Sequence, residues 1–169
     1  MKNIRNGFFE TNSSSVHALI WPKEKKSDLK IPGKFIEFKE GTFGGSHIDS
    51  DLSDVEEKAS YLFELCKYLE NNMYENPEGV DYISRIEYML GMQGIETFFN
   101  YNEDDNGFYD NRYGAKAILK KIFEGEETLL QYFADPNVTV RIRSDDFYGD
   151  PKTDVVKGID KEKFECVVA

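Results

Sequence analysis

The groups best suited to chemistry lie close to the N-terminus, in a polar run between two apolar segments. Residues 10–17 read Glu-Thr-Asn-Ser-Ser-Ser-Val-His. A carboxylate and an imidazole can move protons, and an arginine with the N–H groups around three serines could hold an anion such as phosphate. The residues of this N-terminal cluster are Arg5, Glu10, Ser13, Ser14, Ser15 and His17. They predict either an enzyme acting on a nucleotide, a nucleic acid or a phosphorylated group, or a turn whose polar side chains bond their own backbone.

Two further segments place a Phe-Tyr pair beside carboxylates, and both have the composition of loops. Residues 103–110 read Glu-Asp-Asp-Asn-Gly-Phe-Tyr-Asp, and residues 145–150 read Asp-Asp-Phe-Tyr-Gly-Asp. Carboxylates can take the place of phosphates against Arg and Lys, while aromatic side chains supply anchoring area at low entropic cost. These acidic–aromatic segments predict a protein-binding face, with solvated loops as the alternative. The candidate binding residues are Glu103, Asp104, Asp105, Phe108, Tyr109, Asp110, Asp145, Asp146, Phe147 and Tyr148.

The sequence does not predict a metal site. Residues 102–107 copy the first half of a calcium-binding loop, but Tyr113 stands where the bidentate glutamate belongs, so an acidic turn is the better interpretation. The chain has two histidines and no Cys/His spacing suited to zinc. Glu124 and Glu126 have the Glu-x-Glu spacing of some ADP-ribosyl-transferring enzymes, yet they fall at a junction between two helical patterns, where acidic residues favour a helix start. We expect no cofactor.

The charge of the chain favours basic partners. Its 169 residues include 32 acidic and 21 basic side chains, which gives a net charge of −11. Such a surface repels nucleic acid and anionic membranes and attracts basic protein surfaces, although acidity also serves solubility. The two cysteines are far apart, and no apolar run is long enough for a signal peptide or a transmembrane helix, so we expect reduced thiols and a cytoplasmic location.

The hydrophobic pattern predicts strands at both ends of the chain and helices in the middle. Predicted strands cover 16–21, 34–39, 95–101, 138–143 and 163–168. A helical stripe runs through 52–69, with Ser53 and Glu56 at capping-box spacing and Ser50 as an alternative cap; a second helix starts at Asn76 and the proline after it and ends at Gly91. Two more helices cover 115–122 and 127–133. We therefore predict a single α+β domain over 1–169, with a mixed or mostly antiparallel sheet and about four helices packed mainly on one face.

The N-terminal residues also carry a resemblance. The string Ile4-Arg5-Asn6-Gly7, followed by Phe9-Glu10-Thr11-Asn12-Ser13-Ser14-Ser15-x-His17, resembles the N-terminal signature of a poorly characterised group of small proteins from phages and mobile elements of low-GC Gram-positive bacteria. The resemblance covers about fifteen residues and transfers no catalytic role. It implies a context, because small acidic phage proteins are often inhibitors of host defence, anti-CRISPR proteins among them.

Charge, acidic–aromatic segments and resemblance together predict an anti-defence protein of a phage or mobile element. We expect it to bind and inhibit a basic host effector that handles nucleic acid, with a CRISPR nuclease or its RNA-bound complex as the favoured partner in the host cytoplasm. Neither direct binding to duplex DNA nor binding to a membrane is expected. The sequence favours binding over catalysis and leaves the enzymatic hypothesis open.

Overall fold

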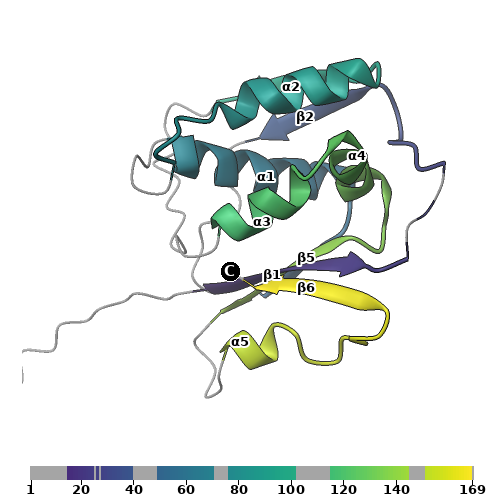
Figure 1. Ribbon diagram of the computed structural model, residues 1–169, viewed down its shortest axis with the longest axis vertical. Helices are drawn as coiled ribbons and strands as arrows, with labels where there is room; N and C mark the ends of the chain where they lie inside the picture. Colours follow the sequence, from purple (N-terminus) through teal and green to yellow (C-terminus); the bar gives the residue numbers. More distant parts are fainter. Residues whose placement is uncertain are drawn as a thin grey trace, which may run out of the picture.

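β1 (Ser15–Pro22) is an inner strand of a four-stranded antiparallel sheet with the order β3–β5–β1–β6. It pairs with β5 (Thr139–Ser144) on one side and with β6 (Phe164–Val168) on the other, and β3 (Ser50–Leu52) extends the sheet beyond β5 (Figure 1). The computed structural model describes residues 15–24, 26, 28–39, 49–70, 76–101, 115–144 and 151–168.

Four helices and a smaller sheet lie on one side of this sheet, and one short helix lies on the other. The helices are α1 (Val55–Glu70), α2 (Tyr82–Met92), α3 (Ala115–Ile122), α4 (Glu126–Ala134) and α5 (Pro151–Asp154). Figure 1 shows α1, α3 and α4 against the four-stranded sheet and α5 on the opposite face. The predicted α+β class, the mostly antiparallel sheet and the gathering of helices on one face are confirmed.

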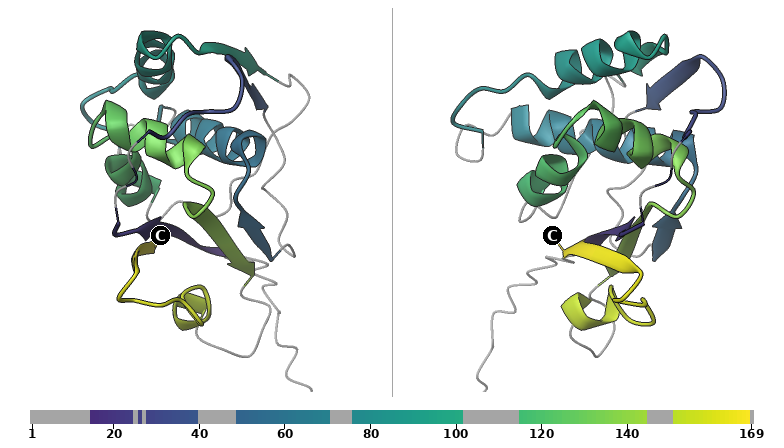
Figure 2. Two further views of the ribbon diagram at one scale, coloured as in Figure 1. Left: turned by 90° about the vertical axis from the view of Figure 1, so that its right-hand side faces the viewer. Right: turned by 45° about the vertical axis from the view of Figure 1, so that its right-hand side comes forward.

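The smaller sheet joins β2 (Phe35–Lys39) and β4 (Glu96–Asn100) in parallel. It packs on α1, and α2 leads directly into β4 beside it (Figure 2). The side chains of Ile36 and Phe38 lie on the inner face of β2 and are buried. The side chain of Phe35 lies on the outer face and is 53% exposed. The alternation predicted for 34–39 is thus a strand with one buried face.

β1 is apolar over most of its length, with His17 as the buried polar exception, because both of its faces are covered. Leu19 belongs to the main core beneath the helices, as do Val140 and Ile142 of β5. Val16 and Ala18 point to the other face and pack against Val155, which follows α5. A strand buried on both sides shows a continuous apolar run instead of alternation, which is the pattern observed at 16–21.

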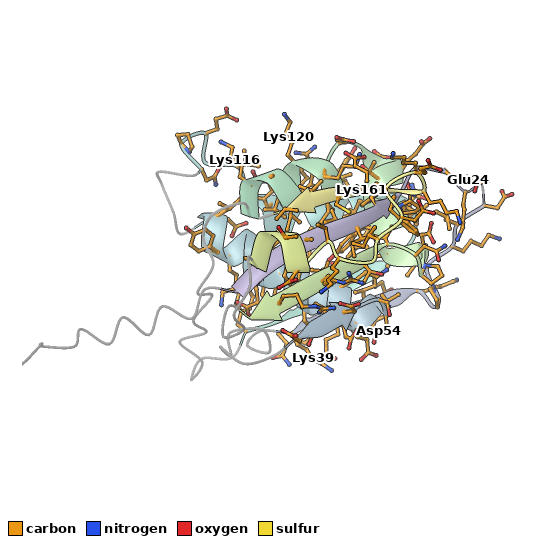
Figure 3. All side chains as sticks on the ribbon, turned by 90° about the horizontal axis from the view of Figure 1, so that it is seen from below. Glu24, Lys39, Asp54, Lys116, Lys120 and Lys161 are labelled. Atoms are coloured by element: carbon orange, nitrogen blue, oxygen red, sulfur yellow. The ribbon has the colours of Figure 1, made fainter. Side chains whose placement is uncertain are left out.

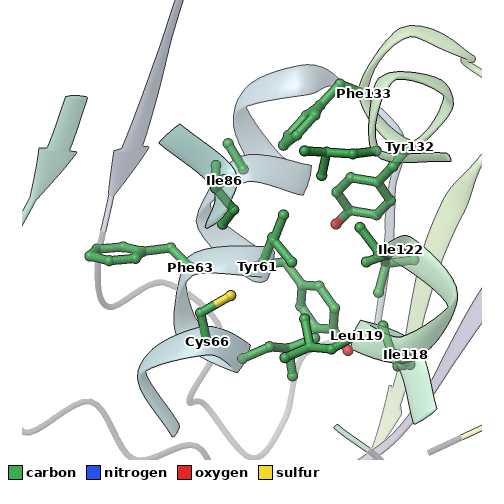
Figure 4. Close-up of a cluster of buried hydrophobic side chains, with 14 of the residues drawn as sticks. Tyr61, Phe63, Cys66, Ile86, Ile118, Leu119, Ile122, Tyr132 and Phe133 are labelled. Carbon is green, nitrogen blue, oxygen red and sulfur yellow. The ribbon is translucent and has the colours of Figure 1, made fainter. Parts of the chain in front are cut away.

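The main core is built where α1, α3 and α4 meet. Figure 4 shows Tyr61 and Cys66 of α1 facing Leu119 of α3, with Tyr132 of α4 alongside. All four side chains are fully buried. Both cysteines of the chain are free thiols. None of the helices in the described part of the chain combines the length and the apolar composition that a membrane-spanning helix needs.

The residue that caps the first helix lies one position after the predicted cap. Asp54 is the capping residue, since its Oδ1 accepts a hydrogen bond of 2.8 Å from the Glu57 N–H, and the Glu57 carboxylate accepts one of 3.3 Å from the Ser53 N–H. The predicted pair of Ser53 and Glu56 is therefore wrong by one position, and the alternative cap Ser50 starts β3 instead.

The second helix begins five residues after the position predicted from the proline. Asn76 closes a turn, with its side chain bonding both the N–H and the carbonyl of Val80 at 3.0 Å. Asp81 caps the helix by accepting 2.8 Å from the Ser84 N–H, and Gly91 lies inside the helix, which continues to Met92. An asparagine that bonds backbone groups four residues ahead stabilises a turn as readily as it starts a helix.

Candidate functional site

Most of the residues singled out from the sequence lie outside the described part of the chain. This holds for Arg5, Glu10, Ser13 and Ser14 of the N-terminal cluster and for both acidic–aromatic segments, 103–110 and 145–150. Of the cluster, the structure places Ser15 at the first position of β1 and His17 two residues further along that strand. The calcium-like segment 102–113 is likewise outside the described residues.

His17 lies in the core, where it contacts α1. Its side chain is 2% exposed, and its Nδ1 lies 3.0 Å from the hydroxyl oxygen of the fully buried Tyr61. Burial lowers the pKa of His17 from 6.5 to about 4, so the imidazole is neutral at pH 7. An imidazole with so low a pKa is a weak base, and because it is buried it does not contact a substrate at the surface. Its position therefore counts against the enzymatic hypothesis, in which His17 moves protons.

We expect His17 to make the protein sensitive to mild acid. Because its pKa is about 4 in the folded protein and about 6.5 in the unfolded chain, the unfolded chain binds more protons between these values. The stability that the neutral His17 side chain contributes to the folded protein is fully present above pH 6.5 and is lost as the pH falls to 4. The free energy of unfolding should drop by about 3 kcal/mol over this window, at about 1.4 kcal/mol for each pH unit.

Urea denaturation at pH 7, 5.5 and 4 measures this effect. The matched variant is His17→Asn, which keeps a polar group near Tyr61 but cannot titrate in this range. The difference in unfolding free energy between the native chain and this variant should shrink in step with acidification. A difference that stays constant from pH 7 to 4 would contradict the assignment.

A lysine and an aspartate form a second buried polar site that the sequence analysis missed. Lys58 Nζ donates to the backbone carbonyls of Asp135 at 3.2 Å and Val138 at 3.3 Å, and both charged residues are fully buried. Burial lowers the pKa of Lys58 from 10.5 to about 8, although the charge of Asp135 raises it. Lys26 reaches the Asp135 carboxylate from the surface at 2.9 Å. The sequence did contain a signal for this site: Lys58 stands three residues after Val55 and so interrupts the apolar stripe of the helix.

Two arginines on the α5 side of the larger sheet are held by one carboxylate. Arg141 Nε and Arg143 Nη2 contact Asp51 Oδ1 at 3.0 and 2.8 Å. Arg141 also donates through Nη1 to the carbonyls of Val155 and Lys157. These contacts use the donors that an anionic ligand would need, and they engage the Asp51 carboxylate. Within the described ranges, no three His, Cys, Asp or Glu side chains are grouped as metal ligands.

Tyr101 is an exposed aromatic residue whose hydroxyl senses the charges of three carboxylates. Tyr101 follows β4, is 55% exposed and rests edge-on against Phe63 with ring centroids 5.2 Å apart. Its pKa is raised by burial and then by the charges of Glu70, Glu87 and Asp81. Each of these three charges is that of a carboxylate. We call Glu70, Asp81, Glu87 and Tyr101 the Tyr101 patch.

Three elements bring the Tyr101 patch together. Glu70 ends α1 and accepts 3.1 Å from the Ile83 N–H, while Asp81 is the cap of α2. These two helix ends lie at the same end of the molecule (Figure 1). The pKa of Glu70 is raised by burial and by the charge of Asp81, although the Ile83 N–H opposes this. Like charges thus lie close enough to repel each other.

Basic side chains, by contrast, project from separate elements. Figure 3 shows Lys39 at the end of β2, Lys116 and Lys120 on α3, and Lys161 before β6. Lys39 is paired with Glu37 at 3.1 Å. The labelled lysines are spread over the outline of the molecule and do not form a single basic face.

Comparison with known proteins gives no relative for this chain. No protein-family model, curated protein or solved structure matches it.

Proposed function

We propose that this protein is an acidic binding protein that occupies a basic surface of a partner that handles nucleic acid. The observation that carries the proposal is the Tyr101 patch, in which three carboxylates act on one exposed aromatic side chain. Tyr101 also lies two residues before Glu103, the start of the acidic–aromatic segment 103–110, so the patch has the same residue types as the segment that follows it.

The chemistry of the patch suits a surface that normally binds phosphate. Carboxylates accept bidentate hydrogen bonds from arginine as phosphates do, and a tyrosine supplies contact area with few rotatable bonds. Because Glu70 and Asp81 repel each other, a cation placed between them relieves that repulsion on binding. The net charge of −11 adds a long-range attraction that accelerates encounter with a basic partner.

The resemblance at the N-terminus supports the choice of partner. It links the chain to small proteins of phages and mobile elements, whose hosts defend themselves with nucleases that have basic nucleic-acid grooves. The favoured partner is a CRISPR nuclease or its RNA-bound complex in the host cytoplasm, and the expected outcome is inhibition of cleavage. The buried position of His17 weighs against the alternative of an enzyme built on the N-terminal cluster.

The test compares two triple variants of equal charge. Glu70→Gln, Asp81→Asn and Glu87→Gln together neutralise the patch and leave one side-chain oxygen at positions 70 and 81 to accept from the Ile83 and Ser84 N–H groups. Only the bond from the Ser84 hydroxyl to Asp81 Oδ2 is lost. The control variant neutralises three carboxylates elsewhere: Glu56→Gln, Glu126→Gln and Glu162→Gln. We expect the patch variant to bind a purified guide-loaded CRISPR nuclease at least about tenfold more weakly, with little loss for the control. The reason is that charges paired with the partner across the interface contribute to affinity, while charges elsewhere on the surface do not.

Binding of the native chain should also weaken as salt is raised, because screening shortens the reach of exposed charges to about 8 Å near physiological ionic strength. Cleavage assays with the same three proteins give the inhibition readout. Equal losses for both variants would show that only net charge matters. Absence of any association with the nuclease at low salt would remove the proposed partner.

A further inference from the structure

β6 forms one edge of the larger sheet, because β1 pairs with it on one side and no described strand pairs with it on the other. The Lys23 N–H donates to the Lys163 carbonyl at 2.8 Å, so Lys163 bonds the β1 side. In an antiparallel pair, residues alternate between those that bond the neighbouring strand and those that point away from it. Cys166 and Val168 therefore direct their N–H and C=O groups away from β1, and within the described ranges these groups have no hydrogen-bond partner. We call this side of the strand the free edge of β6.

The free edge of β6 lacks the features that usually protect the edge of a sheet. Such edges are commonly blunted by short strands, charged side chains or proline. β3, at the other edge of the same sheet, has three residues and carries Asp51. β6 has five residues, of which four are apolar, and its one carboxylate, Glu165, is bound to Lys121 at 3.1 Å. An edge of this kind is suited to pairing with another strand.

The two faces of β6 differ in chemistry. Because Glu165 contacts Lys121 of α3, it lies on the helix side of the sheet, and alternation places Phe164, Cys166 and Val168 on the other face. These three side chains are apolar, and Val168 is 38% exposed. An added strand would therefore meet apolar side chains on one face and α3 on the other.

The α3 face of this edge is positive. α3 and β6 together carry three lysines and one glutamate, although the whole chain has a net charge of −11. Lys116 and Lys120 are exposed, and among the described residues neither is bound to a carboxylate. Figure 3 shows both on the β6 side of the sheet, away from Lys39. The charge next to the free edge thus favours carboxylates.

This charge decides between two occupants of the edge. A second copy of the chain, paired through its own β6, would bring the lysines of two α3 helices to one seam, where like charges repel. A strand with carboxylates on its α3 face would instead attract them.

We propose that the free edge of β6 receives an extended segment of a partner protein as an added antiparallel strand. The segment has apolar side chains at alternate positions, which lie beside Phe164, Cys166 and Val168, and carboxylates between them, which face Lys116 and Lys120. Main-chain hydrogen bonds to Cys166 and Val168 supply affinity, and the alternation supplies specificity. This surface does not depend on the Tyr101 patch and takes a partner of the opposite charge.

The test is a titration of the full chain with the peptide acetyl-Val-Glu-Val-Glu-Val-Glu-Val-amide, followed by amide hydrogen exchange in NMR. We expect saturable binding that slows exchange at Cys166 and Val168 at least about tenfold, and at Val167 less, since that amide already bonds β1. Physiological ionic strength limits repulsion from the net charge to about 8 Å. The same peptide with lysine for glutamate should bind at least about tenfold more weakly.

N-methylated peptides test the direction of pairing. In an antiparallel pair, the residue opposite Cys166 shares its face and bonds it directly, so the valines of the peptide bond β6 and the glutamates do not. N-methylation of the two inner valines should abolish binding, while N-methylation of the first and last glutamates should leave it nearly unchanged. Equal losses for the two peptides would overturn the proposal.

Variants of the chain test the edge itself. Cys166→Pro removes the central outward N–H, and a proline whose missing N–H faces away from the sheet is tolerated on an edge strand. It should weaken the acidic peptide at least about tenfold, while Cys166→Ala, which keeps the N–H, should not.

If the proline variant does not fold, Lys116→Gln with Lys120→Gln decides the case. This pair should weaken binding about three- to tenfold, and the control pair Lys34→Gln with Lys39→Gln at β2 should not. Absence of binding, or binding without protection of Cys166 and Val168, would overturn the proposal.

Discussion

Asp135→Asn is expected to lower the free energy of unfolding by about 3–5 kcal/mol at pH 7, because it leaves the buried Lys58 ammonium without its opposing charge. The asparagine keeps an oxygen that can accept from the Asn137 N–H, as Asp135 Oδ1 does at 2.9 Å, so the backbone turn is retained. The exposed substitution Glu126→Gln serves as control and should change stability by no more than about 0.5 kcal/mol.

The pH dependence identifies the cause. Burial lowers the pKa of Lys58 to about 8, so above pH 8 the folded protein holds a neutral amine that needs no counter-charge. The unfolded chain binds more protons between pH 8 and 10.5, and native stability should rise with pH across that range. The cost of Asp135→Asn should therefore shrink above pH 8. Chemical denaturation at pH 7 and 9.5 measures it, and an equal cost at both pH values would argue for lost packing.

Phe38→Ala is expected to destabilise the protein by about 3–5 kcal/mol, the usual cost of removing a buried aromatic ring. Phe38 of β2 is fully buried and stacks on Phe99 with ring centroids 4.6 Å apart. It also meets Phe63 and Phe133 edge-on, at 6.5 and 6.0 Å. Because a two-stranded sheet is marginally stable alone, this ring holds the smaller sheet on the helices.

The matched control is Phe35→Ala in the same strand. Phe35 is 53% exposed on the outer face, so we expect its replacement to cost less than about 1 kcal/mol. Guanidinium denaturation of the two variants beside the native chain gives the comparison. Similar losses for both would mean that the small sheet is stabilised by strand propensity and not by the aromatic core.

The sequence predicted the elements whose pattern extends over several residues. The alternation of apolar and polar residues in β5 and the apolar stripes of α3 and α4 were sufficient to identify these elements, because each pattern repeats its period at least twice. β3 has three residues and α5 has four, too few for any period to show. The start of α2 was wrong because Asn76 has the same chemistry in a turn as in a helix cap.

The sites were harder to predict because they combine distant residues. The carboxylates of the Tyr101 patch come from the end of α1, the cap of α2 and the middle of α2, and only packing brings them to Tyr101. Lys58 and Asp135 are 77 residues apart. Acidic residues could be recognised from the sequence where they are contiguous. His17 was a candidate for proton transfer, and its burial beside Tyr61 could not be predicted because the two residues are 44 positions apart.

The position of β1 determines when this chain can fold during synthesis. β1 leaves the ribosome well before both strands that pair with it, since β5 and β6 come from residues 139–168. The nascent chain must therefore keep an apolar strand unpaired until those residues have also emerged. Closure of so long a loop makes the sheet a late event, and a nascent chain in this state is a substrate for chaperones that bind exposed apolar strands.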